Sequence, residues 1–487
     1  MMRLFFVFAA FQFLSVYAVI AASEERKSPW ADIALTDIDA IYRLIKDNHP
    51  GPVDEQNPAY RKSMESNYQK ARNLAKDVKN YNGYYFAVKY FANSFNDGHI
   101  SLIDSVVKKR NFWPKFAVVL VGKDFLVQHA EASSGEKYPQ VGDRVLTCDG
   151  RSPHDMLQED IKKYYGVDGL VAEDVMDSAH LFIDYGNPFV ERPKECRFSR
   201  DGETFSATLD WKSISSEKIE TIRKQLTGLN RPDYAVTEFS ENAYWIRLPS
   251  FQTSNENTTK LKGIIKTIGE MAETLQKADA IVFDMRGNTG GNSSWGDQAL
   301  KTLWGSEILD HAGRGWSYID WRVSEENIRA NNYYADLYLG VEGEEGGRVK
   351  YYRGLAAALQ KERDAGNTFY RITNRASTRD KMPEPPVAKI FLLTNFTCFS
   401  ACLDFADSVR SIPGATHIGS PTRADAIYID NWAVPLPSGL ARLSYSMKVY
   451  RGRIRGHNEP YIPHIAYEGA DWSTPALQLW VSSLVHE

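Results

Sequence analysis

Apolar positions are spaced differently in successive parts of the chain, and each spacing predicts a different kind of structure. From about residue 30 to residue 96 they recur every three to four positions, as in LTDIDAIYRLIKDNH, which is typical of amphipathic helices. From about residue 112 to residue 211 they alternate, as in FAVVLV and DFLVQHA, which predicts strands. Beyond residue 216 helical patterns alternate with the apolar runs AYWIRLPSF, AIVFDMRG and KIFLLTN, so this part is expected to form an α/β core. Residues 309–386 have a weak pattern and receive no assignment.

The first 22 residues form a separate segment, with one cation at Arg3, a long apolar stretch and small residues before SEERK. This pattern is typical of a secretory signal peptide. An uncleaved membrane anchor is the alternative, because the stretch approaches the ~20 residues that a bilayer requires. Cleavage would release a periplasmic or extracellular chain, in a compartment where disulfides persist.

The four cysteines fall into two groups. Cys148 and Cys196 lie far apart in segments that both resemble strands, and they can pair. Cys398 and Cys402 are four positions apart, a spacing that places two side chains on one helix face but seldom gives disulfide geometry.

Composition and charge exclude several classes of function. The 487 residues include 58 Lys and Arg against 62 Asp and Glu, a formal charge of −4 without a long basic run, which argues against a nucleic-acid partner. The sequence contains no C-x-x-C, no H-E-x-x-H and no Gly-rich phosphate loop. We therefore expect neither a metal nor an organic cofactor.

Three short segments have residues suited to acyl-transfer chemistry. In IVFDMRGNTGG, Gly290 and Gly291 follow a predicted strand and allow backbone N–H groups to turn toward a ligand, although a plain strand-to-helix turn is the alternative. In NFTCFSACLDFAD, Ser400 lies where a strand meets a helix, a place for a nucleophile or for an ordinary helix cap. In FNDGHISLID, His99 lies in a turn and can accept a proton near neutral pH.

The segment VGDRVLTCDGRSPHDML resembles the peptide-binding PDZ fold. Its Gly142-Asp143 turn leads to a strand, a tight turn at Asp149-Gly150 and a helix. A strand near FSATLDW would close such a domain, and the residues from about 162 to 191 would be an insertion in it. PDZ domains bind peptide tails by strand addition, so tail recognition is one possible role.

The order of these segments resembles the C-terminal processing (tail-specific) serine peptidases, a family that includes the tricorn protease core and retinoid-binding relatives. Four features follow one another between about residue 34 and the end of the chain: D-G-H, a PDZ-like domain, D-x-R-x-N-x-G-G and S-A. The resemblance implies a ClpP/crotonase-like α/β core with a helical N-terminal unit and a β-rich PDZ-like domain. It assigns the nucleophile to Ser400, and the oxyanion donors to Gly290 or Gly291 together with the N–H of Ala401.

The family has two catalytic designs, and the sequence favours the one with a histidine base. Where the tail-specific branch carries a lysine, this chain has Asp425, so a Ser-Lys dyad is not expected. The tricorn-like branch uses a histidine and a late glutamate, which His99 and Glu459 match. The serine that precedes the histidine in tricorn is Gly98 here, so Ser101, or Asp425, would have to assist. The charged residues beside the motifs, Asp97, Asp284 and Arg286, are expected to brace their turns.

The sequence thus predicts a secreted or periplasmic serine endopeptidase that acts on peptides or unfolded proteins. Two alternatives stay open: a non-catalytic ligand- or peptide-binding protein on the same fold, and hydrolysis of an ester or lactam. Membrane association is expected only if the N-terminal segment is not cleaved, and the oligomeric state is open. The predicted boundaries are 1–22 for the signal peptide, 23–111 for the helical unit with His99, 112–215 for the PDZ-like domain and 216–487 for the peptidase core.

Overall fold

A six-stranded sheet forms the centre of the C-terminal half, in the order β18-β15-β14-β11-β10-β9. The structure is a computed structural model that describes residues 28–105, 111–131, 138–227, 232–311, 316–374, 386–469 and 471–486, so the predicted signal peptide lies outside the described residues. All neighbouring strands are parallel except β9, which is antiparallel to β10. The strands are β9 (Ala235–Ser240), β10 (Ala243–Arg247), β11 (Ala280–Asp284), β14 (Lys389–Thr394), β15 (Thr416–Gly419) and β18 (Ile465–Ala466).

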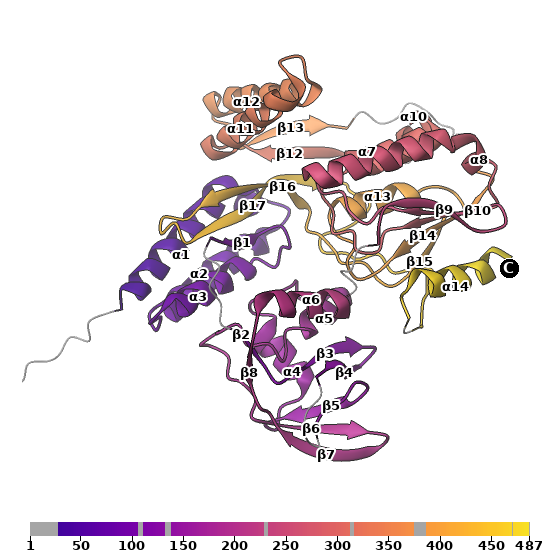
Figure 1. Cartoon of the computed structure of the whole chain (residues 1–487). Coiled ribbons are helices and arrows are strands. Elements are labelled where there is room, and N and C mark those ends of the chain that lie inside the picture. The colour runs from indigo at the N-terminus through magenta and orange to yellow at the C-terminus, as the bar shows by residue number, and fades with distance from the viewer. Residues whose placement is uncertain are drawn as a thin grey trace, which may run out of the picture.

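Helices cover both faces of this sheet, and the strands are apolar on both sides as a result (Figure 1). In β11, Ile281 and Phe283 face one group of helices, whereas Ala280 and Val282 face α14. A continuous apolar run is what a parallel strand buried on both faces requires. The βαβα order predicted from the sequence is therefore confirmed. The covering helices are α7 (Asn255–Glu270), α8 (Ala272–Gln276), α9 (Ser294–Trp304), α10 (Ser306–His311) and α13 (Ala401–Arg410), with α14 (Thr474–His486) opposite.

The N-terminal helices pack against a second sheet to which the C-terminal part of the chain contributes most strands. This sheet has the order β1-β17-β12-β13, with β16 also paired to β17. Two of its strands and two further helices come from residues 309–386, which the sequence left unassigned. The elements are α1 (Pro29–Asn48), the 3-10 turn η1 (Gly51–Val53), α2 (Pro58–Ala75), α3 (Tyr81–Asn93), β1 (Ser101–Asp104), β12 (Tyr318–Arg322), α11 (Glu325–Glu342), α12 (Gly347–Asp364), β13 (Phe369–Thr373), β16 (Tyr428–Pro435) and β17 (Ala441–Arg451).

The middle of the chain forms a separate β-rich unit below these two sheets (Figure 1). Its antiparallel sheet runs β3-β4-β5-β6-β7, and β2 pairs with β8. Asp149 and Gly150 have φ values of 46° and 82°, so the predicted tight turn is present. The elements are β2 (Asn111–Trp113), β3 (Phe116–Val121), β4 (Asp124–Ala130), β5 (Arg144–Cys148), α4 (Pro153–Met156), the π-helical turn η2 (Leu157–Ile161), α5 (Val171–Ser178), β6 (Glu195–Arg200), β7 (Glu203–Thr208), β8 (Lys212–Ile214) and α6 (Ser216–Leu226).

Both pairs of cysteines form disulfides. Cys148 and Cys196 join β5 to β6, as the sequence allowed. Cys398 and Cys402 are also bonded, with Cα atoms 5.3 Å apart, so the expectation that their spacing disfavours a bridge was wrong. That expectation assumed a helical segment, but α13 begins only at Ala401, and the turn before it brings the two cysteines together.

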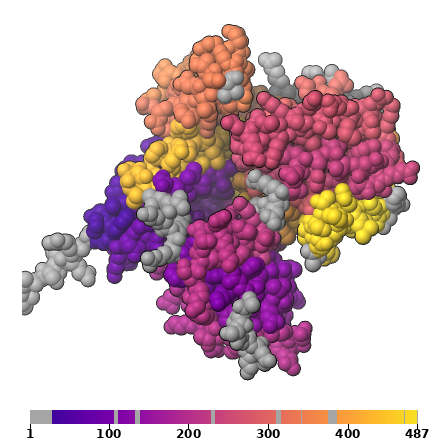
Figure 2. Space-filling view, in the orientation of Figure 1, coloured from indigo at the N-terminus to yellow at the C-terminus, as the bar shows by residue number. Residues whose placement is uncertain are grey.

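No helix within the described part of the chain is both long and apolar enough to cross a membrane. The surface is hollowed where the N-terminal helices, the middle unit and the α/β core meet (Figure 2).

Candidate active site

The loops that follow two neighbouring parallel strands meet at one edge of the central sheet. Ser400 follows β14, and Gly290 and Gly291 follow β11. Because parallel strands end at the same edge, the residues after them converge there. A Cβ atom built on Gly290 would lie 2.8 Å from the Cβ of Ser400, so the two loops are in direct contact.

Ser400 has an unusual backbone conformation, with φ 56° and ψ −122°. Residues other than glycine seldom adopt positive φ, and such conformations persist where the surrounding structure enforces them, often at functional sites. The Ser400 side chain makes no capping hydrogen bond to α13, so its Oγ is not used to start the helix. This excludes the plain helix-cap interpretation of Ser400.

His99 lies between α3 and β1, in a segment 301 positions away from Ser400, yet its Nε2 is 3.3 Å from the Ser400 Oγ. The imidazole is 7 % exposed. It packs against the ring of Phe399, with ring centroids 4.9 Å apart. The Asn431 side chain on β16 donates a hydrogen bond to the His99 carbonyl, 3.2 Å away, so β16 also fixes the histidine turn. The two predicted catalytic side chains therefore do lie together.

Burial favours the neutral form of the His99 imidazole. Removal from water lowers the pKa of His99, although the carboxylate of Asp425 opposes that shift. When Nε2 accepts from the serine hydroxyl, Nδ1 has the proton, and Nδ1 is 3.7 Å from Oδ1 of Asp97. The Nδ1 atom has no hydrogen-bond partner among the described residues.

Asp97, for which the sequence predicted only a bracing role, also faces the His99 ring. Its Oδ1 accepts the His99 backbone N–H at 2.8 Å, which is the predicted bracing role, and the same oxygen faces the His99 ring. Burial raises the pKa of Asp97 to about 7. Its Oδ2 lies 4.0 Å from Nε2 of His49, and neither atom has a hydrogen-bond partner within the described ranges. The D-G-H spacing was the available signal, because a carboxylate two positions before a histidine can reach its ring.

Of the three backbone N–H groups predicted as oxyanion donors, one donates to a protein acceptor and two do not, among the described residues. Gly290 donates its N–H to Oδ1 of Asn288 at 2.9 Å. In contrast, neither Gly291 N–H nor Ala401 N–H donates to a protein acceptor in the part of the chain that the structure describes. Gly290 is instead required for close packing, since a Cβ there would lie 2.7 Å from the Phe399 carbonyl oxygen and 3.0 Å from the Ala401 nitrogen.

The bracing role predicted for Asp284 and Arg286 agrees with their contacts. Arg286 Nε donates to Asp284 Oδ1 at 2.9 Å, and its Nη2 donates to Oδ2 at 2.6 Å. Trp245 Nε1 also donates to Asp284, at 2.9 Å. Gly287 N–H donates to the Thr397 hydroxyl at 2.9 Å, which ties this loop to the loop of Ser400.

Gly98, the position of the missing assisting serine, has no room for a side chain. A Cβ there would come within 2.9 Å of the Phe399 ring. Ser101, the predicted substitute, is exposed at the start of β1 and pairs with Ser444 of β17. The structure therefore does not bring Ser101 to the imidazole.

Asp425 belongs to a buried ionic cluster beneath the histidine. Burial alone would raise its pKa, but Arg455 and Arg453 outweigh this effect and hold the pKa of Asp425 below its usual value. Arg453 Nη1 is 2.9 Å from Asp425, and Arg455 binds Asp404, Asp407 and Asp425 together. Asp425 therefore acts on His99 as a fixed negative charge.

Glu459 is exposed, and its carboxylate accepts the Gly456 N–H at 2.7 Å. The structure does not bring it into a hydrogen bond with His99 or Ser400. Glu459 instead lines a cavity of about 460 Å³ between residues 169–172 of the middle unit and the loops at 421–422 and 457–462. Arg423, beside this cavity, lies over the Phe399 ring at 4.5 Å and donates to Glu173 of α5 at 2.6 Å. The middle unit thus forms one wall near the Ser400 turn.

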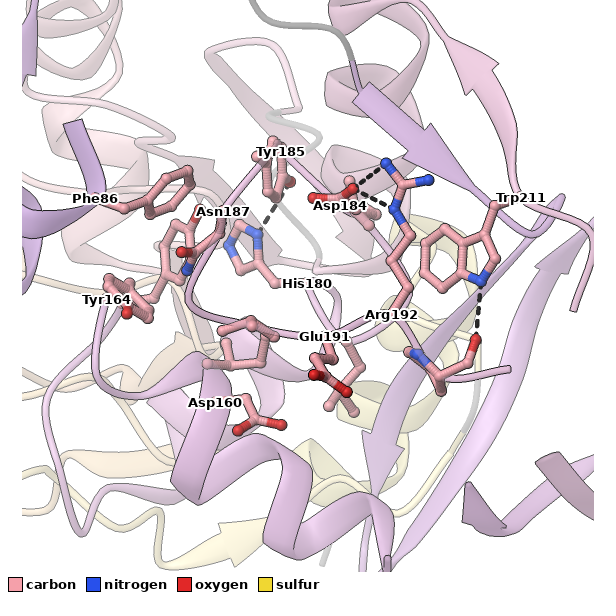
Figure 3. A pocket seen from close by; sticks show the side chains of 16 residues that line it. Phe86, Asp160, Tyr164, His180, Asp184, Tyr185, Asn187, Glu191, Arg192 and Trp211 are labelled. Carbon is pink, nitrogen blue, oxygen red and sulfur yellow. Dashed lines mark hydrogen bonds and ion pairs between the residues drawn. The ribbon is translucent and has the colours of Figure 1, made fainter. Parts of the chain in front are cut away.

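A second hollow lies between α3 and the middle unit (Figure 3). Its polar side chains are largely paired with one another: His180 Nδ1 is 3.0 Å from the Tyr185 hydroxyl, and Arg192 binds Asp184. Trp211 Nε1 donates to the Pro193 carbonyl at 2.9 Å. This hollow shares no lining residue with the loops of Ser400, Gly291 and His99.

Comparison with solved structures gives an extensive likeness. Mature CPAF matches with a TM-score of 0.63 at 15 % sequence identity, over 94 % of this chain and 98 % of the other. The chain has the fold of mature CPAF. The same protein complexed with lactacystin matches with a TM-score of 0.61 at 16 % identity, over 94 % of this chain and 100 % of the other.

A looser likeness, to the photosystem II D1 C-terminal processing protease, has a TM-score of 0.35 at 12 % identity over 91 % of this chain and 94 % of the other. No protein-family model and no curated protein matches the sequence. The CPAF likeness bears out the mixed α/β architecture expected from the resemblance.

Proposed function

We propose that this protein is a serine peptidase in which Ser400 is the nucleophile and His99 is the general base. One observation carries the proposal: His99 Nε2 lies 3.3 Å from the Ser400 Oγ although the residues are 301 positions apart. A buried, neutral imidazole at hydrogen-bond distance from a serine hydroxyl is the arrangement that activates such a hydroxyl.

The proposed reaction begins when His99 Nε2 removes the proton from Ser400 as the Oγ attacks a peptide carbonyl. The free N–H groups of Gly291 and Ala401 stabilise the oxyanion, and the N-terminus of α13 favours the same negative charge. The imidazolium then gives its proton to the leaving amine. Water, deprotonated by the same histidine, hydrolyses the acyl-enzyme.

Two carboxylates, those of Asp97 and Glu459, are candidates for the group that orients His99. Asp97 faces the ring nitrogen Nδ1 at 3.7 Å, and this geometry favours it as the group that stabilises the imidazolium. Glu459, which the family resemblance favours, borders the cavity of about 460 Å³ and is proposed to act when substrate fills that cavity. The variants Asp97→Asn and Glu459→Gln separate these roles, because only loss of the orienting carboxylate lowers kcat with KM unchanged.

The substrate class and location follow from the resemblance. We propose a polypeptide substrate cleaved by a ClpP/crotonase-like core, with residues 112–215 acting as a PDZ-like unit that binds peptide tails. The antiparallel sheet and the tight turn at Asp149 support such a unit. The apolar segment at residues 1–22 and the two disulfides support a secreted or periplasmic location.

The test is labelling of the purified protein with a fluorophosphonate probe. The wild type should label, and Ser400→Ala and His99→Ala should not. Ser482→Ala removes a hydroxyl from α14 and serves as the matched control that labels normally. Labelling of Ser400→Ala at the wild-type rate would refute the assignment. A folded wild type that does not label at all would favour the non-catalytic binding protein.

A further inference from the structure

The disulfide between Cys398 and Cys402 closes a small ring of backbone with Ser400 at its centre. The ring contains Phe399, Ser400 and Ala401 between the bonded cysteines. Both cysteines are fully buried, in the core between the central sheet and the helices above it. The nucleophile, one oxyanion donor and the aromatic ring that supports His99 are thus held within a single covalent loop.

Inside this loop, Ser400 has a backbone conformation that is unfavourable for a residue other than glycine. Ser400 has φ 56°, and a non-glycine residue relaxes from that region toward negative φ when nothing prevents it. Relaxation would rotate the Cα–Cβ bond of Ser400 away from His99 Nε2. It would also turn the Ala401 N–H away from the Gly290 loop, which it closely approaches.

On its α13 side the turn is held by the Ser400 carbonyl, which accepts the Leu403 N–H at 2.7 Å and the Asp404 N–H at 3.2 Å, but the other backbone bonds are long. Cys398 N–H donates to the Asn395 carbonyl at 3.2 Å, and Cys402 N–H donates to the Phe399 carbonyl at 3.2 Å, both near the long limit for such bonds. The serine side chain makes no capping bond that would fix the turn from within. The ties to the oxyanion loop are made by Thr397, outside the ring. On the Phe399 side of Ser400, where the hydrogen bonds are long, the covalent link across the turn supplies an additional constraint.

We propose that the Cys398–Cys402 disulfide is a positioning element, which keeps Ser400 in its left-handed conformation and so aligns both the nucleophile and the Ala401 N–H. This inference rests on the proposed peptidase function. It assigns the bridge a role in alignment at the reacting centre, whereas Cys148–Cys196 has the ordinary role of joining two strands.

The two disulfides provide a matched pair of variants. Cys398→Ala with Cys402→Ala should lower the fluorophosphonate labelling rate and kcat at least tenfold, with KM for a peptide substrate unchanged, because displacement of a reacting atom lowers rate much more than binding. Cys148→Ala with Cys196→Ala should keep the wild-type labelling rate. Its melting temperature should fall further than that of the first variant, because a bridge spanning 48 positions constrains the unfolded chain more than one spanning 4.

A second measurement does not depend on how a variant folds. Wild type is exposed to dithiothreitol, whose two thiols are oxidised to a cyclic disulfide as each protein bridge becomes two thiols. Samples are alkylated over time and analysed by peptide mass, in parallel with labelling. Labelling should decay in step with opening of Cys398–Cys402 and not with opening of Cys148–Cys196.

The outcomes distinguish the inference from the function beneath it. If the wild type labels and the folded Cys398→Ala, Cys402→Ala variant labels at the same rate, the positioning role is refuted while the peptidase assignment stands. Labelling that persists after the Cys398–Cys402 disulfide has been reduced would also refute the positioning role. A wild type that fails to label removes the peptidase assignment and the inference with it.

Discussion

Replacement of Asp97 by asparagine should change activity and stability in opposite directions. In the wild type, Asp97 Oδ1 accepts the backbone N–H of His99 at 2.8 Å, and asparagine keeps an oxygen that can accept this bond. Asparagine has no charge, however, to offset that of an imidazolium. If Asp97 orients and stabilises the protonated His99, kcat should fall on the order of 10²-fold at pH 8. If Asp97 only braces the turn, kcat should change little.

The effect on stability follows from the raised pKa of Asp97. Burial moves this pKa from 3.8 to about 7 in the folded protein. Between these two values the folded state holds a proton that the unfolded state releases. The stability that this proton contributes is therefore fully present below pH 3.8 and is lost as the pH rises through about 7. At 1.36 kcal/mol per pKa unit, the whole loss is about 4 kcal/mol, of which about 3 kcal/mol falls between pH 5 and pH 8.

The assay is urea denaturation of the wild type and Asp97→Asn at pH 5 and pH 8, with kcat/KM measured over the same range. The wild type should lose stability relative to the variant as the pH rises, while its kcat/KM increases through about pH 7 as Asp97 ionises. The variant should lack that rise. Asp177→Asn is the control: burial raises the pKa of Asp177 to about 7 as well, so its stability profile should flatten, but its activity should stay at the wild-type level.

Parallel stability profiles for the wild type and Asp97→Asn would show that Asp97 is ionised in the folded protein, against the reasoning above. Full activity in Asp97→Asn would remove it from the catalytic arrangement and leave Glu459 as the carboxylate to pursue.

Three further substitutions test the packing around the site. Gly290→Ala should reduce fluorophosphonate labelling about 10²-fold, because the added Cβ would lie 2.8 Å from the Ser400 Cβ at a residue with φ 93°; Gly263→Ala in α7, where a Cβ meets nothing within 4 Å, should label normally. Gly98→Ala should slow labelling about tenfold by displacing the Phe399 ring from His99, and an unchanged labelling rate would contradict that packing. Arg455→Met should lower the free energy of unfolding by about 3–5 kcal/mol in urea, because it leaves buried carboxylates without their cation; a loss under 1 kcal/mol would mean that Arg453 neutralises them alone.

The central sheet was predictable because its signals are local. Strands β10, β11 and β14 are short apolar runs, each followed by a polar or glycine-rich turn and then an amphipathic helix, and that order alone indicates parallel strands. The contact between the loops of Ser400 and Gly290 follows from the same order, since both loops continue from adjacent parallel strands.

Most of the second sheet was not predictable because, apart from the β16–β17 hairpin, nothing local specifies its strand pairings. Its strand β1 pairs with β17, and β12 pairs with β17 and β13, so these three pairings join segments that lie far apart in the sequence. Helix α11 also leaves Tyr333 and Leu337 about half exposed, which weakens the periodic signal in residues 309–386.

Details of the site depended on tertiary contacts in the same way. Three of these details arise where the N-terminal unit meets the core. They are the orientation of Asp97 toward His99, the lack of space for a side chain at Gly98 and the burial of Asp425. The Cys398–Cys402 bridge was missed because a spacing of four was judged as a helical spacing, whereas the chain turns at Ser400.

The pairing of β1 with β17 also governs when during synthesis His99 can take its place beside Ser400. Ser101 cannot meet Ser444 until the residues between them have been made, a delay on the order of tens of seconds at typical rates of translation. Until then the N-terminal helices lack the strands that cover their apolar face, and His99 lacks the serine with which it pairs. A chain that ends before β17 therefore lacks the strands that close the N-terminal core, and it lacks the strand that pairs with β1 just after His99.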